Sequence, residues 1–359
     1  MKAPRNNNPI PNQPFASNDL PTLKGPYWDV ALGEGLGLGS SGNSITAQGG
    51  GGGSLPAQLP PFNCSTDIDT AGIVIFYEAW SGCTSLTAFP LLDVGQGINF
   101  NSAWAFCTSL TSFPLLDVSQ GTNFNNAWNN CPSLTAFPLL DVSQGTSFIS
   151  AWYNCQSLTA FPLLDVSQGI NFNGAWYNCQ SLTAFPLLDV SQGTNFYSAW
   201  ANCQSLTAFP LLDVSQGTNF NYAWGNCTSL TSFPLLDVSQ GTNFYSAWGN
   251  CESLTAFPLL DVSQGTDFGV AWYNCTSLTS FPAAMFDSCS TNYNQAFRFA
   301  WQNCALSQTS VNNILVSLDA SGIVNNYVNI DGGTSAAPSG AGATAKLSLQ
   351  GKGWTVVTN

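Results

Sequence analysis

Residues 107–130 read CTSLTSFPLLDVSQGTNFNNAWNN, and residues 131–154 read CPSLTAFPLLDVSQGTSFISAWYN. The two segments align without a gap, and the same unit continues in both directions along the chain. A fixed period of roughly 20–50 residues is the signature of a repeat architecture, in which each unit packs only on its neighbours. This stretch therefore decides the fold, which we predict to be a solenoid.

Cysteine and tryptophan mark the repeat most clearly. Cysteine recurs every 24 residues from Cys83 to Cys275, and tryptophan does so from Trp80 to Trp272. A partial unit precedes this series and a stretched one follows it. We predict a solenoid of about ten repeats over residues 55–304, mainly β, with short parallel strands joined by short turns and helices.

A single unit is too small to fold alone. Ordering its backbone costs about 1–2 kcal/mol per residue, whereas burying each large apolar side chain contributes only about 1.5–3 kcal/mol. Stacking supplies the difference through burial and hydrogen bonds between coils. In each coil we predict a short strand over Ser85–Phe89, which ends at Pro90 because proline cannot donate to a ladder. The predicted core positions, with their equivalents in the other coils, are Leu86, Phe89, Leu91, Val94, Phe100, Trp104 and Cys107.

Two motifs resemble leucine-rich repeats. Leu86-x-x-Phe89-x-Leu91 matches the LxxLxL pattern, and Ala-Trp-x-x-Cys-x-Ser-Leu-Thr-x-Phe-Pro resembles the BspA-like subclass. The resemblance covers residues 73–304 and implies a leucine-rich-repeat-like fold. Two departures are that tryptophan replaces the usual phenylalanine, and that Val94 fills the asparagine-ladder position.

The C-terminal residues 305–359 break the repeat and are predicted to form a small α/β cap. Ser310 is expected to cap a helix, and strands are expected at Tyr327–Ile330 and Trp354–Thr358. A short helix is expected near Ala343–Leu349. Solenoids need such a cap to cover the last coil. This tail also resembles the ends of repeat proteins found in phage tail and virion genes.

The N-terminal region has a different composition. Residues 1–31 are rich in Asn and Pro, and residues 32–54 are rich in glycine. One interpretation is a flexible linker throughout. The other is an anchor segment over residues 1–31 followed by a linker over residues 32–54, which would attach the solenoid to a larger assembly.

Charge excludes several classes of partner. The chain has six basic residues and a formal net charge of −13, and no Lys or Arg lies between Lys24 and Arg298. Phosphate neutralisation requires such residues, so we expect no nucleic-acid binding. No apolar run approaches the roughly 18 residues that span a bilayer, so no membrane insertion is expected. The N-terminus lacks a secretory h-region, which leads us to expect folding in a cytoplasm.

The sequence offers no catalytic constellation and contains no histidine. The regularly spaced cysteines are interpreted as buried free thiols, with disulfides or metal ligation as the alternatives. A column of aspartates is interpreted as solvated or bonded to turn amides, with calcium binding as the alternative. We therefore expect no enzyme activity, metal or cofactor. The column consists of Asp93, Asp117, Asp141, Asp165, Asp189, Asp213, Asp237 and Asp261.

The coils differ mainly beside the Ala-Trp pair. These differences are interpreted either as drift at exposed turns or as a Tyr/Asn surface able to bind a ligand, since aromatic faces suit sugars. The candidate binding residues are Asn125, Tyr153, Tyr177, Tyr197, Tyr222, Tyr245 and Tyr273.

These features together suggest a non-enzymatic virion protein. We expect a phage tail-fibre, spike or capsid-decoration component that presents a rigid surface to a host receptor or glycan. It would attach to other assembly proteins through its N-terminal segment and form a homo-oligomer or part of a larger assembly. The alternative is a BspA-like adhesin on a bacterial cell surface.

Overall fold

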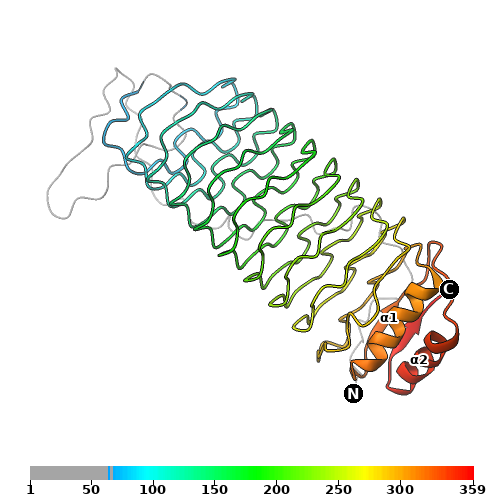
Figure 1. The fold of residues 1–359 in the computed structure, drawn as a ribbon. Helices are drawn as coiled ribbons and strands as arrows, with labels where there is room; N and C mark the ends of the chain where they lie inside the picture. The colour runs from blue at the N-terminus through cyan, green and yellow to red at the C-terminus, as the bar shows by residue number, and fades with distance from the viewer. Residues whose placement is uncertain (1–63, 65–67) are drawn as a thin grey trace, which may run out of the picture. The chain divides into compact units, whose positions relative to one another are not determined.

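The computed structural model describes Cys64 and residues 68–359, which belong to one unit of the chain, Ile45–Asn359. The expected anchor (1–31) and linker (32–54) lie outside the described residues. The repeat units form successive coils that stack along one axis, as the cyan-to-yellow part of Figure 1 shows. The described residues therefore form a repeat solenoid, followed by two helices and two short strands.

Backbone hydrogen bonds hold each coil to its neighbours in strict 24-residue register. On the side that carries the Ala-Trp pair, N–H groups donate to the following coil, as in Phe100 to Asn123 (2.9 Å) and Trp104 to Ala127 (2.9 Å). On other sides the donors point to the preceding coil, as in Thr111 to Thr87 (2.9 Å). Every coil thus both donates to and accepts from its neighbours.

The core consists of aromatic columns. Trp176 is fully buried, and its ring stacks on Trp152 at 5.6 Å and on Trp200 at 5.8 Å. Phe185 packs edge-on against it at 4.9 Å. The same arrangement repeats in each coil, so the prediction that tryptophan, phenylalanine and cysteine point inward is confirmed.

The prediction of regular strands in each coil is wrong. Within the described part of the solenoid, parallel pairing is limited to isolated bridges, and the most continuous series runs through Asn99, Asn123 and their equivalents. Bridges at the Ala88 position occur between only some coils. Proline follows this position by two residues, and residues with positive φ interrupt the turn side, so extended backbone never persists.

The assignment of Leu91 to the core is also wrong. Leu91 is 76% exposed, and its equivalents in the next seven coils are exposed as well. The following leucine turns inward instead: Leu116 and Leu140 are 4% and 2% exposed. The two leucines after the proline therefore face opposite sides of the chain, and the LxxLxL pattern does not describe this coil.

An asparagine ladder is present, but at the residue before each repeat cysteine from Cys131 to Cys275 rather than at Val94, which is buried. Asn226 Nδ2 donates to Asn202 Oδ1 at 2.7 Å, and Asn274 Nδ2 donates to Asn250 Oδ1 at 3.1 Å. These asparagines adopt positive φ, for example +61° at Asn178. Asparagine tolerates this left-handed conformation better than most residues and also supplies an amide for the ladder.

We expect Asn178→Ala to destabilise the protein more than Asn178→Gly. Both remove the amide bonds to Asn154 and Gln180, but only alanine adds the strain of a Cβ in the left-handed region. The expected losses are about 1 kcal/mol for glycine and about 2 kcal/mol for alanine. Urea unfolding of the two variants measures the difference, and equal losses would show that backbone strain plays no part here.

The C-terminal cap contains α1 (Gln308–Ala320), β1 (Tyr327–Asn329), α2 (Gly340–Gly351) and β2 (Thr355–Val357), with β1 and β2 parallel. The helices lie at the orange-to-red end of Figure 1. This agrees with the predicted order of elements in the cap.

The predicted helix cap is corrected from Ser310 to Ser307. Ser307 is the N-cap of α1, and its side chain accepts from the Ser310 amide. Ser310 is buried and joins α1 to the last coil, because its hydroxyl donates to Thr279 O at 2.9 Å and accepts from the Phe281 amide at 2.9 Å. The helix is thus bonded directly onto the end of the solenoid.

Candidate functional site

The predicted Tyr/Asn residues lie in three adjacent columns of the turn that carries the Ala-Trp pair. Tyr153, Tyr177 and Tyr273 follow the tryptophan, whereas Tyr222 precedes the alanine. Asn125, Tyr197 and Tyr245 lie one residue earlier. Because the coils stack in register, residues far apart in sequence share this side of the solenoid.

Four of these tyrosines form what we call the tyrosine cluster: Tyr153, Tyr177, Tyr197 and Tyr222. The rings of Tyr153 and Tyr177 stack with centroids 4.6 Å apart and planes 9° apart. Burial, followed by the Tyr177 and Tyr197 phenols, raises the pKa of Tyr153 to about 12. Burial, followed by the Tyr177 phenol, also raises the pKa of Tyr222. Tyr177 is therefore the central member: its ring stacks on Tyr153, and its phenol interacts electrostatically with Tyr197 and Tyr222.

The cluster is half-buried, not fully exposed. In the column of Tyr153 and Tyr177, the next coils carry Ala201, Gly225 and Gly249, which bring no further ring to the stack. The Tyr222 ring lies over Gly225, where any Cβ would clash with it, and its hydroxyl bonds to Asn226 Nδ2 at 2.6 Å. The raised pKa values of Tyr153, Tyr177 and Tyr222 keep these phenols neutral at pH 7, and the cluster presents ring surface with hydroxyl and amide groups beside it.

The other three predicted residues lie outside this cluster. Asn125 has a structural role, because its Oδ1 accepts from the Ser147 hydroxyl (2.6 Å) and the Ile149 amide (3.0 Å) of the next coil. Tyr245 is 43% exposed and lies against Gly269. Tyr273 occupies the same column as Tyr177, but it lies in the last coils. The seven predicted residues therefore do not form one contiguous surface.

The cysteine column provides hydrogen bonds to the backbone. Nine free thiols donate to the tryptophan carbonyl of the preceding coil, for example Cys179 Sγ to Trp152 O at 3.3 Å and Cys203 Sγ to Trp176 O at 3.4 Å. Cys289 donates to Val262 O at 3.2 Å instead. The cysteines from Cys107 to Cys304 are free and buried, which confirms the sequence interpretation. From the repeat pattern these cysteines could be predicted only as small buried apolar groups. Their hydrogen bonds to backbone carbonyls could not be predicted from it.

One disulfide was not predicted. Cys64 bonds to Cys83, with an S–S distance of 2.03 Å and a sequence separation of 19 residues. Cys83 occupies the first position of the cysteine column, so the bond attaches the preceding segment to the first coil. Its separation is not a multiple of the repeat, and the repeat pattern therefore gave no sign of it.

We expect the free thiols to be unreactive in the folded protein. Burial raises the pKa of Cys155 and of Cys227 to about 12, so essentially no thiolate exists at pH 8. Of twelve cysteines, two form the disulfide and ten are free. A chromogenic disulfide reagent should titrate almost none of these ten thiols in the native state and all of them in denaturant. Rapid native labelling would contradict the buried assignment.

The aspartate column is bonded to its own turn. Asp117 Oδ1 accepts from the Ser119 hydroxyl at 2.7 Å and from the Ser119 amide at 3.1 Å, and other coils repeat the amide bond. These bonds, the hydroxyl first, lower the pKa of Asp117. Their stabilisation is present above the unfolded carboxyl pKa and is lost as pH falls through the lower folded value. The carboxylates are exposed, so the effect is small.

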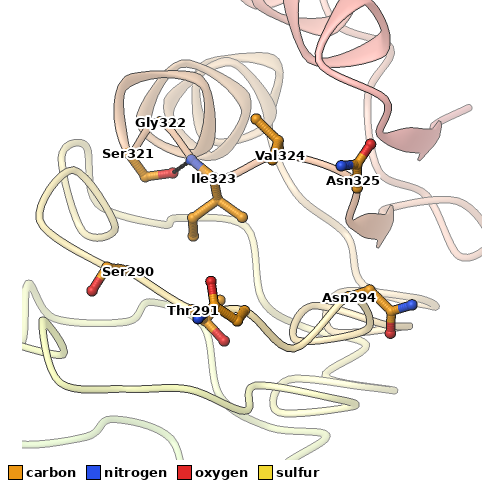
Figure 2. Close-up of a pocket in the computed structure, with 9 residues that line it drawn as sticks. Ser290, Thr291, Asn294, Ser321, Gly322, Ile323, Val324 and Asn325 are labelled. Atoms are coloured by element: carbon orange, nitrogen blue, oxygen red, sulfur yellow. Dashed lines mark hydrogen bonds between the residues drawn. The ribbon is translucent and has the colours of Figure 1, made fainter.

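A surface pocket lies between the last coil and the cap (Figure 2). Ser290, Thr291 and Asn294 line one side, and the segment Ser321–Asn325 after α1 lines the other. The Ile323 side chain points across it toward Thr291. The lining contains hydroxyl, amide and aliphatic groups but no titratable side chain, so it offers no acid–base chemistry.

The described part of the chain shows neither a metal-binding cluster nor a membrane-spanning helix. Cys64 and residues 68–359 contain no group of three or more Asp, Glu, His or Cys side chains placed to hold a metal ion. Within the same residues, no helix has the length and apolarity needed to cross a bilayer.

Comparison with known proteins gives one distant structural match of note. No protein-family model matches the sequence, and no curated protein matches it. Among solved structures, a leucine-rich repeat protein from Bacteroides ovatus is similar, with 14% sequence identity and a TM-score of 0.26. The match covers 66% of this chain and 83% of that one. Superposition this loose assigns no family.

Proposed function

We propose that this chain is a non-enzymatic adhesion protein that binds a glycan through the tyrosine cluster. The observation that carries the proposal is the gathering of Tyr153, Tyr177, Tyr197 and Tyr222 on one turn side, where the coils after Tyr177 carry Ala201, Gly225 and Gly249 in its column. Ring faces pack well against sugar C–H groups, and neighbouring hydroxyls and amides bond to sugar hydroxyls. The coils beneath the cluster are fixed by inter-coil bonds, so little ordering is needed on binding.

The setting that we propose is a virion, as a tail-fibre, spike or capsid-decoration component. A rigid solenoid suits a part that must hold a binding surface away from a particle. The resemblance of residues 305–359 to the ends of phage repeat proteins supports this setting, and attachment through the N-terminal segment remains part of the proposal. The alternative is a BspA-like bacterial surface adhesin. Proteomics of purified virus particles beside a cell-surface fraction separates the two.

The binding proposal is tested with Tyr177→Ala on an array of neutral hexose and N-acetylhexosamine oligosaccharides. We expect wild-type protein to bind a subset of these glycans and Tyr177→Ala to lose at least about 10-fold in affinity, as loss of one aromatic contact predicts. Tyr273→Ala is the matched control, because Tyr273 occupies the same column outside the cluster and should retain binding. Absence of binding by the wild type, or equal loss in both variants, would refute the proposal.

A further inference from the structure

An exposed column of leucines runs along the solenoid and has no role in the fold or in the tyrosine cluster. We call it the leucine stripe: Leu91, Leu115, Leu139, Leu163, Leu187, Leu211, Leu235 and Leu259. Its members are between 53% and 76% exposed, although each neighbours a leucine that is buried or partly buried. The next coil carries Ala283 at this position, so the stripe ends before the cap.

The stripe is an invariant, apolar column on the exposed surface. Leucine occupies this position in all eight coils, whereas the exposed position of Thr146 and Ile170 varies. Coils bonded in register lie about 4.8 Å apart, so the leucines follow one another along the solenoid at that spacing and form an apolar line. At roughly 100 Å² of exposed apolar surface each, the stripe offers on the order of 800 Å². Monomeric proteins rarely expose contiguous apolar patches above about 300–600 Å².

We propose that the leucine stripe is a self-association surface, whose partner is the leucine stripe of a second copy of this chain. The available area matches the roughly 800 Å² per partner that a standard stable interface buries. A line of leucines repeating at the coil spacing needs a partner with the same spacing along its whole length. A second copy of this chain has the same coil spacing, because it consists of the same repeats. This proposal is independent of the glycan-binding proposal.

Charge selects the orientation of the two copies. Each leucine is followed two residues later by an exposed aspartate, so an acidic column flanks the stripe on one side only. Antiparallel stripes would place both aspartate columns on the same side, where they would repel each other. Parallel stripes, related by a two-fold axis along the solenoid, place them on opposite sides. Each aspartate column then faces the exposed Thr and Ala positions of the other copy. The dimer is therefore parallel and in register.

The association is tested by sedimentation equilibrium on the full chain. We expect wild-type protein to dimerise at micromolar concentration. Replacing Leu139, Leu163, Leu187 and Leu211 by Gln should weaken dimerisation at least 100-fold while leaving the circular dichroism spectrum unchanged, because these side chains are exposed. The matched control replaces another exposed column, Gln144, Gln168, Gln192 and Gln216, by Ser and should dimerise as the wild type does. A monomeric wild type, or a dimeric leucine variant, would overturn the proposal.

Orientation is tested with single cysteines, since the native thiols are buried. With a short bis-maleimide, Leu91→Cys should cross-link to itself, because the first coils of the two copies meet in a parallel dimer. In an antiparallel dimer Leu91 would meet Leu259, and a mixture of Leu91→Cys with Leu259→Cys would give only mixed cross-links. That second pattern would refute the parallel arrangement.

Discussion

Trp176→Ala is expected to destabilise the solenoid by about 3–5 kcal/mol and to split its unfolding into two transitions. Trp176 lies in the middle of the stack, is fully buried, and contacts rings of both neighbouring coils. Truncation leaves a cavity that the flanking rings cannot fill without breaking the register of the inter-coil hydrogen bonds. Because each coil contacts only its neighbours, the two halves should then unfold separately. Urea unfolding followed by circular dichroism measures both effects.

The control for this prediction is Trp176→Phe. The indole N–H of Trp176 is buried and has no acceptor among the described residues, a feature shared with the other tryptophans from Trp104 to Trp301. Phenylalanine keeps a stacking ring and removes a donor whose burial costs about 1–3 kcal/mol. The net loss should therefore be only about 1–2 kcal/mol. A loss equal to that of alanine would show that the ring stack contributes little.

Gly193→Ala is expected to be the second most damaging change, at about 2–3 kcal/mol. A Cβ at Gly193 would lie 2.5 Å from Phe196 Cζ and 2.9 Å from the Val190 carbonyl oxygen. Phe196 cannot move aside, since its ring is fully buried and stacks on Phe172 and Phe220. The glycine is thus required for space, and thermal or urea unfolding should show the loss directly.

Gly351→Ala is the matched control for this change. Gly351 is the last residue of α2, and a Cβ added there would meet no atom within 4 Å. Alanine favours helix and reduces the entropy of the unfolded chain, so stability should stay the same or rise by up to about 1 kcal/mol. Equal destabilisation by both changes would mean that the loss at Gly193 does not come from the clash.

The sequence was enough to predict the repeat, its period and most of its core. Identical coils that stack in register give equivalent residues the same burial, so one apolar pattern predicts the core of every coil. The error at Leu91 came from applying the LxxLxL pattern across a proline. Asp93 and Val94 carried the correct signal: with a charged residue outside and an apolar one inside, alternation places Leu92 inside and Leu91 outside. The exposure of the leucine stripe could therefore have been predicted from the alternation over residues 91–94.

Other features depended on geometry that the sequence does not show. The asparagine before each repeat cysteine from Cys131 to Cys275 was visible as a repeated residue, but its left-handed backbone and its amide ladder were not. Of the seven predicted binding residues, only the structure separates the tyrosine cluster from Asn125, Tyr245 and Tyr273. That grouping depends on which columns become neighbours, and on where small residues such as Gly225 let a ring lie flat.

The near identity of the inter-coil contacts also creates ambiguity during folding. A nascent coil can pair with a coil one whole repeat away and make almost the same bonds, leaving 24 residues looped out. Such slipped states compete with the native one because local contacts barely distinguish them. Only the two ends are unlike the rest: the Cys64–Cys83 bond marks the first coil, and Ser310 with α1 marks the last. These two end contacts therefore fix the register in which the coils pair, and with it the number of coils in the folded solenoid.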